Sequence, residues 1–181
     1  MIKIKDLTVK FDKTILENVN LTFEKGIYCI FAPSGRGKTT LLNAIAGLIK
    51  YKGEIETNGT ISYIFQEDRL LNWLSAKENI MLVSPDEIKA NDLMNILGVK
   101  EFQNKKTQEL SGGMKRRCAL VRGLAYNADI YLLDEPFRAL DEDNIKIVRE
   151  IIKEMAKDKL FIVVTHNEED IKLLNAQKVL L

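Results

Sequence analysis

A buried strand, a glycine-containing turn and an amphipathic helix follow one another over residues 27–49, and this stretch limits the possible folds more than any other. Residues 27–31 are apolar throughout (Ile-Tyr-Cys-Ile-Phe), which predicts a strand buried on both faces. Apolar residues then recur at helical spacing over residues 41–48. The turn between them, residues 32–40, is Ala-Pro-Ser-Gly-Arg-Gly-Lys-Thr-Thr. This order predicts an α/β fold built on a parallel sheet.

The turn is suited to hold a polyphosphate. Gly35 and Gly37 let successive backbone N–H groups point inward, and the positive end of the helix dipole is directed at the same place. Lys38 is then expected to reach the β- and γ-phosphates of a nucleotide, and the Thr39 hydroxyl to ligate Mg²⁺. Ala32 replaces the first glycine of the pattern G-x-x-x-x-G-K-[ST]. We expect this to cost little, because we do not expect a positive φ there.

Composition is compatible with a single globular domain. The chain has 181 residues, of which 46% are hydrophobic, enough for a sizeable core. Its net charge of +1 provides no electrostatic argument for a nucleic-acid partner. No apolar run approaches the roughly 18 residues of a membrane span, and the first residues lack the apolar stretch of a signal peptide, so we expect a cytoplasmic protein. Cys29 and Cys118 have no metal-like spacing and are expected in the core.

Two β segments flank the phosphate loop. Residues 2–23 alternate apolar and polar side chains, which predicts an antiparallel hairpin that leads into the buried strand. Within it, Phe11 is either an ordinary core residue or an aromatic that stacks on a nucleobase. Another β segment, over residues 52–65 with turns marked by Gly53 and Gly59, is followed by Gln66. An amide there can point into the ligand crevice and contact the metal or the attacking water, or it is only a loop residue.

Residues 67–125 have a helical pattern. Residues 75–78 and 84–87 are both capping boxes, and Pro85 is expected at the first position of the second helix. Apolar side chains cluster at residues 70–74 and include a tryptophan. This cluster is either part of the core or a docking surface for another protein, because aromatic anchors dominate such surfaces.

A Leu-Ser-Gly-Gly sequence at residues 110–113 begins a further helix. Ser111 is a natural N-cap, and Gly112 and Gly113 leave backbone N–H groups uncovered. Two interpretations remain open from these residues alone. The segment is either a plain capped helix start or a second anion site that serves the phosphate loop of a neighbouring molecule.

Polar groups follow two further buried strands, at residues 130–133 and 160–164. Adjacent carboxylates at the end of a buried strand are costly unless they meet a cation or take part in chemistry. We expect Asp134 to hold Mg²⁺ through water and Glu135 to polarise an attacking water, help that is worth ~10²–10⁴ in rate. His166, the only histidine, is expected to contact the γ-phosphate.

These motifs, in this order, resemble the nucleotide-binding subunit of ATP-binding cassette (ABC) transporters, and the resemblance covers nearly the whole chain. It implies an ATPase with a P-loop NTPase core, an antiparallel β subdomain and an inserted helical subdomain, using ATP and Mg²⁺. Residues 1–66 and 126–181 would form the core with the β subdomain, and residues 67–125 the helical subdomain. The motifs that carry the resemblance are Ala-Pro-Ser-Gly-Arg-Gly-Lys-Thr-Thr (32–40), Gln66, Leu-Ser-Gly-Gly (110–113), Leu-Leu-Asp-Glu-Pro (132–136), Ala-Leu-Asp (139–141) and His166.

The resemblance also implies a role for each site residue. The catalytic residues would be Lys38, Glu135 and His166. The metal would be held by Thr39, Gln66 and Asp134. The nucleotide would be bound by Phe11, Ala32, Pro33, Ser34, Gly35, Arg36, Gly37, Lys38, Thr39, Thr40, Gln66, Ser111, Gly112 and Gly113.

Members of this family work as head-to-tail pairs, so the resemblance implies a second copy of this chain or a homologous ATPase as a partner. Ser111 and its glycines would close over the γ-phosphate bound by the partner's Lys38. A membrane permease would hold the subunit at the cytoplasmic face of the membrane, and no nucleic-acid partner is expected. Phe137 and residues 65–71 look like the importer branch that serves nitrate, sulfonate or taurine uptake. An exporter subunit and a non-transport ABC ATPase are the alternatives.

Two residues depart from the family pattern. Met114 replaces the usual glutamine of the signature, which removes side-chain hydrogen bonds near the partner's nucleotide. Gly123 replaces a residue that is normally alanine, at an expected cost of up to ~1 kcal/mol of helix stability.

Overall fold

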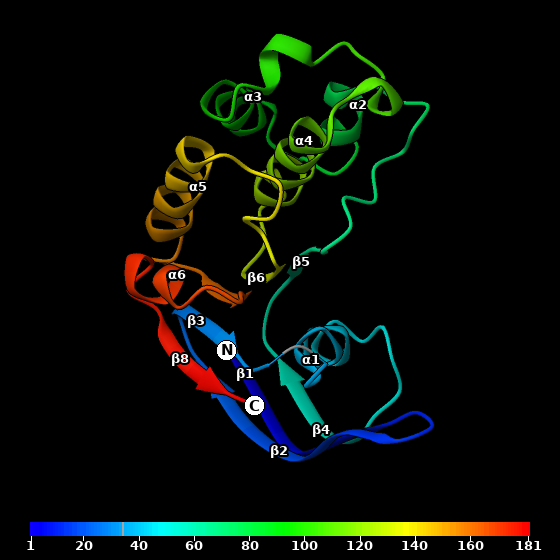
Figure 1. The fold of residues 1–181 in the computed structure, drawn as a ribbon, viewed down its shortest axis with the longest axis vertical. Helices are drawn as coiled ribbons and strands as arrows, with labels where there is room; N and C mark the ends of the chain where they lie inside the picture. The colour runs from blue at the N-terminus through cyan, green and yellow to red at the C-terminus, as the bar shows by residue number, and fades with distance from the viewer. Residues whose placement is uncertain (34) are drawn as a thin grey trace.

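The computed structural model describes residues 1–33 and 35–181. Within these ranges the chain forms an antiparallel sheet, a parallel sheet and helices that pack on them (Figure 1). The antiparallel sheet has the order β2-β1-β4. Its strands are β1 (Ile2–Lys10), β2 (Thr14–Phe23) and β4 (Lys52–Thr57).

The hairpin predicted over residues 2–23 is confirmed as β1 and β2. Ile4 lies opposite Leu21 on β2 and opposite Ile55 on β4. The alternation of buried residues in β1 changes phase after Ile4, where the register shifts at Asp6, a residue with a φ of 50°. An extra residue in one strand moves the following side chains to the other face. Leu7 therefore points into the core, as Ile4 does.

The second sheet is parallel and contains the strands that end at the candidate site. Its order is β5-β6-β7-β3-β8. Because the strands are parallel, the carboxyl ends of β3, β5, β6 and β7 lie at the same edge. The strands are β3 (Gly26–Phe31), β5 (Ile61–Ile64), β6 (Ile130–Asp134), β7 (Leu160–Val164) and β8 (Gln177–Leu180).

The segment over residues 52–65 differs from the prediction. We expected one β segment with turns, but β4 pairs with β1 in the antiparallel sheet, whereas β5 pairs with β6 in the parallel sheet. Gly53 lies inside β4, and a side chain there would come within 2.5 Å of the Lys5 and Asp6 carbonyl oxygens. It is therefore a point of close backbone contact between strands and not a turn.

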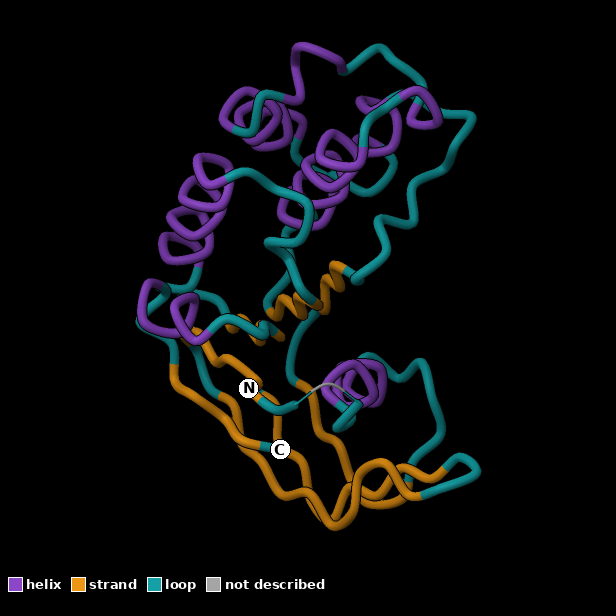
Figure 2. The backbone as a smooth tube through the Cα atoms, in the orientation of Figure 1, coloured by secondary structure: helices purple, strands orange, loops and turns teal. Residues whose placement is uncertain are grey.

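The parallel sheet separates two hydrophobic cores. One lies between this sheet, the antiparallel sheet and α1 (Lys38–Ile45), and the other lies against α4 (Gly112–Ala125) and α5 (Glu142–Met155). Leu132 of β6 belongs to the first core and Leu133 to the second. Successive side chains of a strand point to opposite faces, so an apolar run of this kind requires cover on both sides. Figure 2 shows the helices grouped away from the antiparallel sheet, except for α1.

Helices form most of the chain between β5 and β6, two strands of the parallel sheet. They comprise α2 (Ala76–Met81), α3 (Glu87–Ile96), short 3-10 turns at Val99–Phe102 and Thr107–Glu109, and α4; α6 (Glu168–Leu173) lies farther along. The capping box at Ser75 and Glu78 is confirmed. The one predicted at Ser84 is wrong, because Asp86 is the N-cap of α3 and accepts from the Lys89 N–H. Among the described residues, no helix is both long enough and apolar enough to cross a bilayer.

Gly123 is explained by packing. A Cβ at this position in α4 would lie 2.3 Å from Cγ1 of Ile64 on β5. Ser62 also donates its hydroxyl to the Gly123 carbonyl oxygen at 2.8 Å. The departure that we expected to cost helix stability is therefore what allows α4 to approach the end of β5.

The apolar cluster at residues 70–74 is not a core cluster as a whole. Leu70 packs against the core, but Trp73 is 67% exposed and Leu71 is also exposed. A large exposed aromatic is the informative exception to burial of apolar side chains. The core interpretation is thus wrong for Trp73, and the docking interpretation stays open.

Candidate functional site

A cleft of about 550 Å³ lies at the carboxyl edge of the parallel sheet. It brings together residues from the hairpin, the phosphate loop and the loops after β5, β6 and β7, which are far apart in the sequence. This is the position where open α/β sheets bind ligands. The predicted site residues that line it are Phe11, Gly35, Gly37, Lys38, Thr39, Thr40, Gln66, Glu135 and His166.

The phosphate loop has the backbone geometry expected of an anion-binding turn. Gly35 and Gly37 have φ values of 76° and 89°, and a Cβ on Gly37 would lie 2.8 Å from Cδ2 of Leu16. Gly37 is also the N-cap of α1 and has no side chain to occupy the first N–H groups of the helix. Those N–H groups can therefore bind an anion.

Lys38 is 6% exposed and lies inside the loop. Its ammonium donates to the carbonyl oxygens of Ala32 at 2.6 Å and Pro33 at 3.1 Å. Ala32 does not have a positive φ, so alanine does not strain the loop, as expected. Arg36 is exposed and does not line the cleft. Ser34, also predicted to bind the nucleotide, lies outside the described residues.

Thr39 and Asp134 form a group suited to a hard cation. The Thr39 hydroxyl donates to Oδ2 of Asp134 at 2.7 Å, while Asp134 is 1% exposed and its Oδ1 has no hydrogen-bond partner among the described residues. Burial raises the pKa of the Asp134 carboxyl, and the bond from Thr39 opposes this shift. A buried carboxylate oxygen without a partner beside a hydroxyl oxygen fits Mg²⁺, which prefers oxygen ligands.

Glu135 contacts two other polar residues of the cleft, His166 and Gln66. Its carboxylate contacts Nε2 of His166 and accepts from Nε2 of Gln66 at 3.4 Å. The Glu135 backbone has a φ of 48°, unusual for a residue with a side chain. Its N–H donates to the Val164 carbonyl oxygen at 3.0 Å. Glu135 thus contacts both of the other side chains that were predicted at separate strand ends.

Phe11 lies at the mouth of the cleft. It is 58% exposed and lines the cleft together with the neighbouring Ile15. The core alternative for Phe11 is therefore wrong, because a core phenylalanine would be buried. An exposed aromatic face beside the phosphate loop is available for stacking.

The Leu-Ser-Gly-Gly segment is not brought into the cleft. Ser111 is the N-cap of α4 and accepts from the Met114 N–H at 3.3 Å, as predicted for a capped helix start. Ser111 and Gly112 are exposed, and a Cβ on Gly113 would lie 3.1 Å from the Ala139 carbonyl oxygen. None of the three lines the cleft.

Two buried arginine contacts near the cleft were not predicted. Arg116 of α4 is 2% exposed and binds main-chain carbonyl groups around Glu135. Arg149 of α5 pairs with Asp170, which also accepts from the Thr165 hydroxyl beside His166. The sequence gives no local sign of these contacts, because their partners are 18 to 51 residues away for Arg116 and 21 for Arg149.

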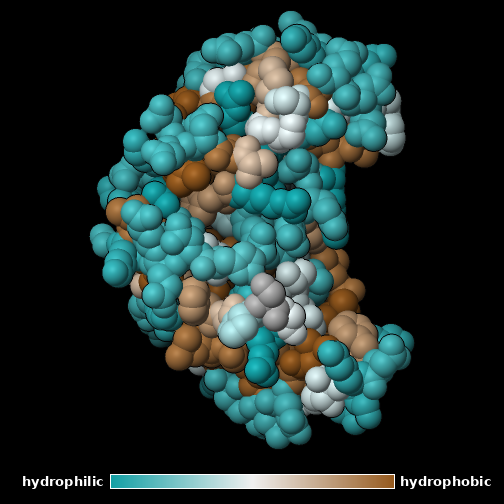
Figure 3. All heavy atoms as spheres, in the orientation of Figure 1, coloured by the Kyte–Doolittle hydropathy of each residue, from teal (hydrophilic) through white to brown (hydrophobic). Residues whose placement is uncertain are grey.

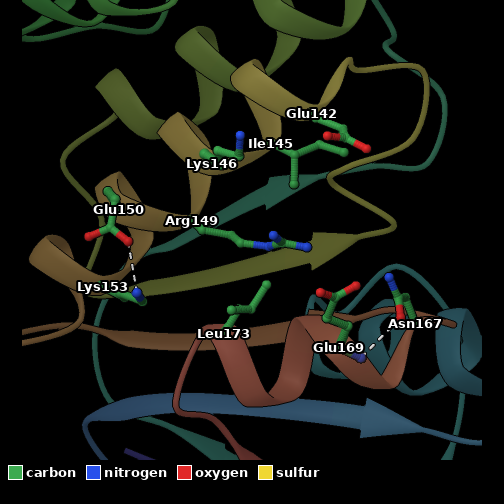
Figure 4. Close-up of a pocket in the computed structure, with 9 residues that line it drawn as sticks. All are labelled: Glu142, Ile145, Lys146, Arg149, Glu150, Lys153, Asn167, Glu169 and Leu173. Carbon is green, nitrogen blue, oxygen red and sulfur yellow. Dashed lines mark hydrogen bonds and ion pairs between the residues drawn. The ribbon is translucent and has the colours of Figure 1, made fainter.

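A second hollow, of about 430 Å³, lies between α5 and α6 and is drawn in Figure 4. Arg149 extends from α5 toward the α6 side, where Asn167 and Glu169 lie. Three glutamates, two lysines and Arg149 line the hollow, and none of the predicted site residues does. The hollow shares no lining residue with the cleft at the sheet edge.

Comparison with known proteins gives the family. The family profile described as ABC transporter matches residues 16–138. This range includes the phosphate loop, the Leu-Ser-Gly-Gly segment and Glu135. The chain belongs to the ABC transporter family.

Relatives of this ABC transporter ATPase match over most of their length. The aliphatic sulfonates import ATP-binding protein SsuB of Bacillus subtilis is 37% identical over 92% of this chain and 72% of the relative. The taurine import ATP-binding protein TauB of Jannaschia sp. is 32% identical over 98% of this chain and 76% of the relative.

A dimeric structure of MJ0796, a bacterial ABC transporter cassette, superimposes with a TM-score of 0.87 at 29% identity, covering 96% of this chain and 91% of that one. A further MJ0796 structure, a post-hydrolysis state bound to ADP and Pi, gives a TM-score of 0.84 at 27% identity. The ABC cassette fold, with its parallel sheet and antiparallel subdomain, is thereby confirmed. The chain is an ATP-binding subunit with ATPase activity.

Proposed function

We propose that this ABC transporter ATPase drives a solute importer by ATP-dependent closure of a head-to-tail dimer and reopening after hydrolysis. Two kinds of observation support import. The relatives TauB and SsuB are import ATP-binding proteins, and they match over most of the chain. The residues after β5, Phe65 to Leu71, also resemble that branch.

The observation that carries the dimer proposal is the division of the site. Lys38, Glu135 and His166 line one cleft, while Ser111 and Gly112 are exposed outside it. A helix N-terminus with uncovered N–H groups favours an anion. The dimeric structure of MJ0796 supports a second copy as the source of that anion. Ser111 of each copy would then complete the triphosphate pocket of the other.

Within the cleft, each polar group has a proposed task. Lys38 binds the β- and γ-phosphates, and Glu135 takes the proton of the attacking water while His166 holds the γ-phosphate. Gly35 and Gly37 bind the phosphates through backbone N–H groups, and Phe11 stacks on the base. Thr39, Asp134 and Gln66 would hold Mg²⁺, which neutralises phosphate charge when bound.

The helical part is the proposed contact with the membrane permease. We assign residues 67–125 to a helical subdomain, and residues 1–66 and 126–181 to the core with its β subdomain. Figure 3 shows the molecule hollowed on the side between the helical part and the part that contains α1. The exposed Trp73 and Leu71 supply an apolar anchor for a permease segment. The subunit would then lie at the cytoplasmic face of the membrane.

The oligomeric state of a variant with slowed ATP hydrolysis tests this proposal. Glu135→Gln keeps the shape of the side chain but removes the base, so it should accumulate as a dimer with MgATP and remain a monomer without it, measured by light scattering after gel filtration. Adding Ser111→Arg should abolish the dimer. Ser75→Arg is the matched control, because Ser75 is also an N-cap, of α2, and lies outside the cleft. A monomer of Glu135→Gln at saturating MgATP would refute the dimer.

A further inference from the structure

Arg116 uses every donor of its guanidinium inside the protein. Nε donates to the Pro136 carbonyl oxygen at 3.1 Å. Nη2 donates to the carbonyl oxygens of Asp134 at 3.1 Å and Glu135 at 2.8 Å. Nη1 donates to the Phe65 carbonyl oxygen at 2.7 Å and to the Asp68 carboxylate at 3.4 Å. Guanidinium has five N–H donors, so none is left without an acceptor.

A buried cation with such partners is costly to keep unless it serves the segments that it binds. Burial lowers the pKa of Arg116, and the Asp68 carboxylate opposes that shift. Four of the acceptors are main-chain carbonyl groups, whose positions depend on the backbone and not on side-chain rotamers. A planar fork can hold several such groups at fixed angles, whereas an ammonium group cannot.

The carbonyl groups belong to the two segments that carry the polar edge of the cleft. Phe65 directly precedes Gln66, and Asp134 to Pro136 include Glu135. The φ of 48° at Glu135 is unfavourable for a residue with a side chain and persists only where the surroundings enforce it. The Arg138 N–H and Arg116 both donate to the Glu135 carbonyl oxygen, the former at 3.2 Å. Arg116 comes from α4, which has Ser111 at its N-cap.

We propose that Arg116 is a positioning residue for hydrolysis, which ties α4 to the backbone of Glu135 and of Phe65 and so sets the direction of the Glu135 carboxylate. Displacement of α4 then changes the position of Glu135 relative to the phosphate loop. The inference rests on the proposed role of Glu135 as the base. It assigns to Arg116 no contact with the nucleotide.

The test compares Arg116→Lys with Arg117→Lys. Arg117 is the next residue of α4, and its side chain contacts the helical part, through the Leu97 carbonyl oxygen at 2.9 Å and the Phe102 ring. We expect Arg116→Lys to lower kcat by about tenfold or more, because small misplacement of a reacting group is costly, with the Kd for MgATP changed less than threefold. Arg117→Lys should leave kcat within twofold. Arg116→Gln, which buries no unpaired charge, is the second variant if Arg116→Lys does not fold.

Two further readouts separate positioning from general damage. Hydrogen exchange at the Glu135 and Arg138 amides should become faster in Arg116→Lys, while amides in the middle of α4 keep their protection. In a Glu135→Gln background the Arg116 change should have no further effect on single-turnover hydrolysis. An equal loss in both backgrounds, or unchanged exchange at Glu135, would overturn the inference. An undiminished rate in Glu135→Gln itself would instead overturn the proposed base.

Discussion

The Thr39 hydroxyl donates to Oδ2 of Asp134 at 2.7 Å and so joins the first turn of α1 to the end of β6 across 95 residues of sequence. The other carboxylate oxygen, Oδ1, is buried and lacks a hydrogen-bond partner within the described part of the chain. Leaving a buried charged oxygen unpaired is unfavourable, which is why burial raises the pKa of Asp134. The pair is therefore arranged to bind a cation. Without a cation, the unpaired Asp134 carboxylate lowers the stability of the folded protein.

Asp134→Asn should raise the melting temperature of the protein without Mg²⁺ and nucleotide. A carboxyl whose pKa is raised by folding destabilises the folded state above that pKa, and the penalty disappears as the pH falls through it. The gain should thus be present at pH 8 and shrink as the pH is lowered toward the ordinary range of aspartate. A gain of about 1 kcal/mol would raise the melting temperature by about 2–4 °C. Adding MgATP should stabilise the parent more than the variant.

Asp129→Asn is the control of opposite sign. Hydrogen bonds from Thr60 lower the pKa of Asp129, so its carboxylate stabilises the folded state at neutral pH. This variant should therefore melt at a lower temperature than the parent at pH 8. If both variants shifted the melting temperature in the same direction at pH 8, the conclusion that the buried Asp134 carboxylate destabilises the folded protein would be contradicted.

Lys38→Ala should weaken ATP binding by about tenfold to a hundredfold, since a hydrogen-bonded charged group contributes ~1.5–3 kcal/mol. Titration calorimetry with MgATP measures this directly. Lys10→Ala removes an exposed lysine at the end of β1 and should leave the affinity unchanged. Binding by Lys38→Ala within twofold of the parent would remove Lys38 from the phosphate site.

Gly123→Ala should destabilise the protein by about 1–3 kcal/mol, because the added methyl group would overlap Ile64 in a packed interior. Gly112→Ala is the matched change in the same helix, where a Cβ would meet no atom within 4 Å. It should be neutral or stabilising by up to about 1 kcal/mol. Urea denaturation measures the free energy of unfolding of the parent and of the two variants. A stabilised Gly123→Ala would show that α4 does not pack on β5 as described.

Trp73→Ala should change the free energy of unfolding by less than about 0.5 kcal/mol, because the side chain is largely exposed. ATPase activity of the isolated subunit should also persist. Association with the permease, followed by co-purification from membranes, should be lost. Leu82→Ala alters another exposed apolar residue of the helical part, and this variant should still associate with the permease. Loss of binding by both variants would mean that Trp73 is no specific anchor.

Local patterns predicted much of the fold and of the site. The strand and helix of residues 27–49 follow from apolar spacing, and the carboxyl-edge location of Gln66, Glu135 and His166 follows from the rule for parallel strands. These predictions rest on residues close together in the chain or on a general property of sheets. They therefore did not require knowledge of particular long-range contacts.

The parts that failed depend on contacts between distant residues. Gly123 requires knowledge of Ile64, and Arg116 binds carbonyl groups up to 51 residues away. At the start of α3, Ser84 and Asp86 both fit a cap from sequence, and the structure uses Asp86. The exposure of Trp73 likewise could not be read from an apolar run, because spacing does not say which side is covered.

Thiol crosslinking between copies tests the shared pocket most directly. Cys29 and Cys118 are both buried, so cysteines introduced by Arg36→Cys and Ser111→Cys in the Glu135→Gln background offer the accessible thiols. A short bifunctional maleimide should then give a covalent dimer with MgATP, and neither single cysteine variant should. Failure to crosslink at saturating MgATP, or an equal yield without nucleotide, would contradict the claim that Ser111 of one copy completes the triphosphate pocket of the other.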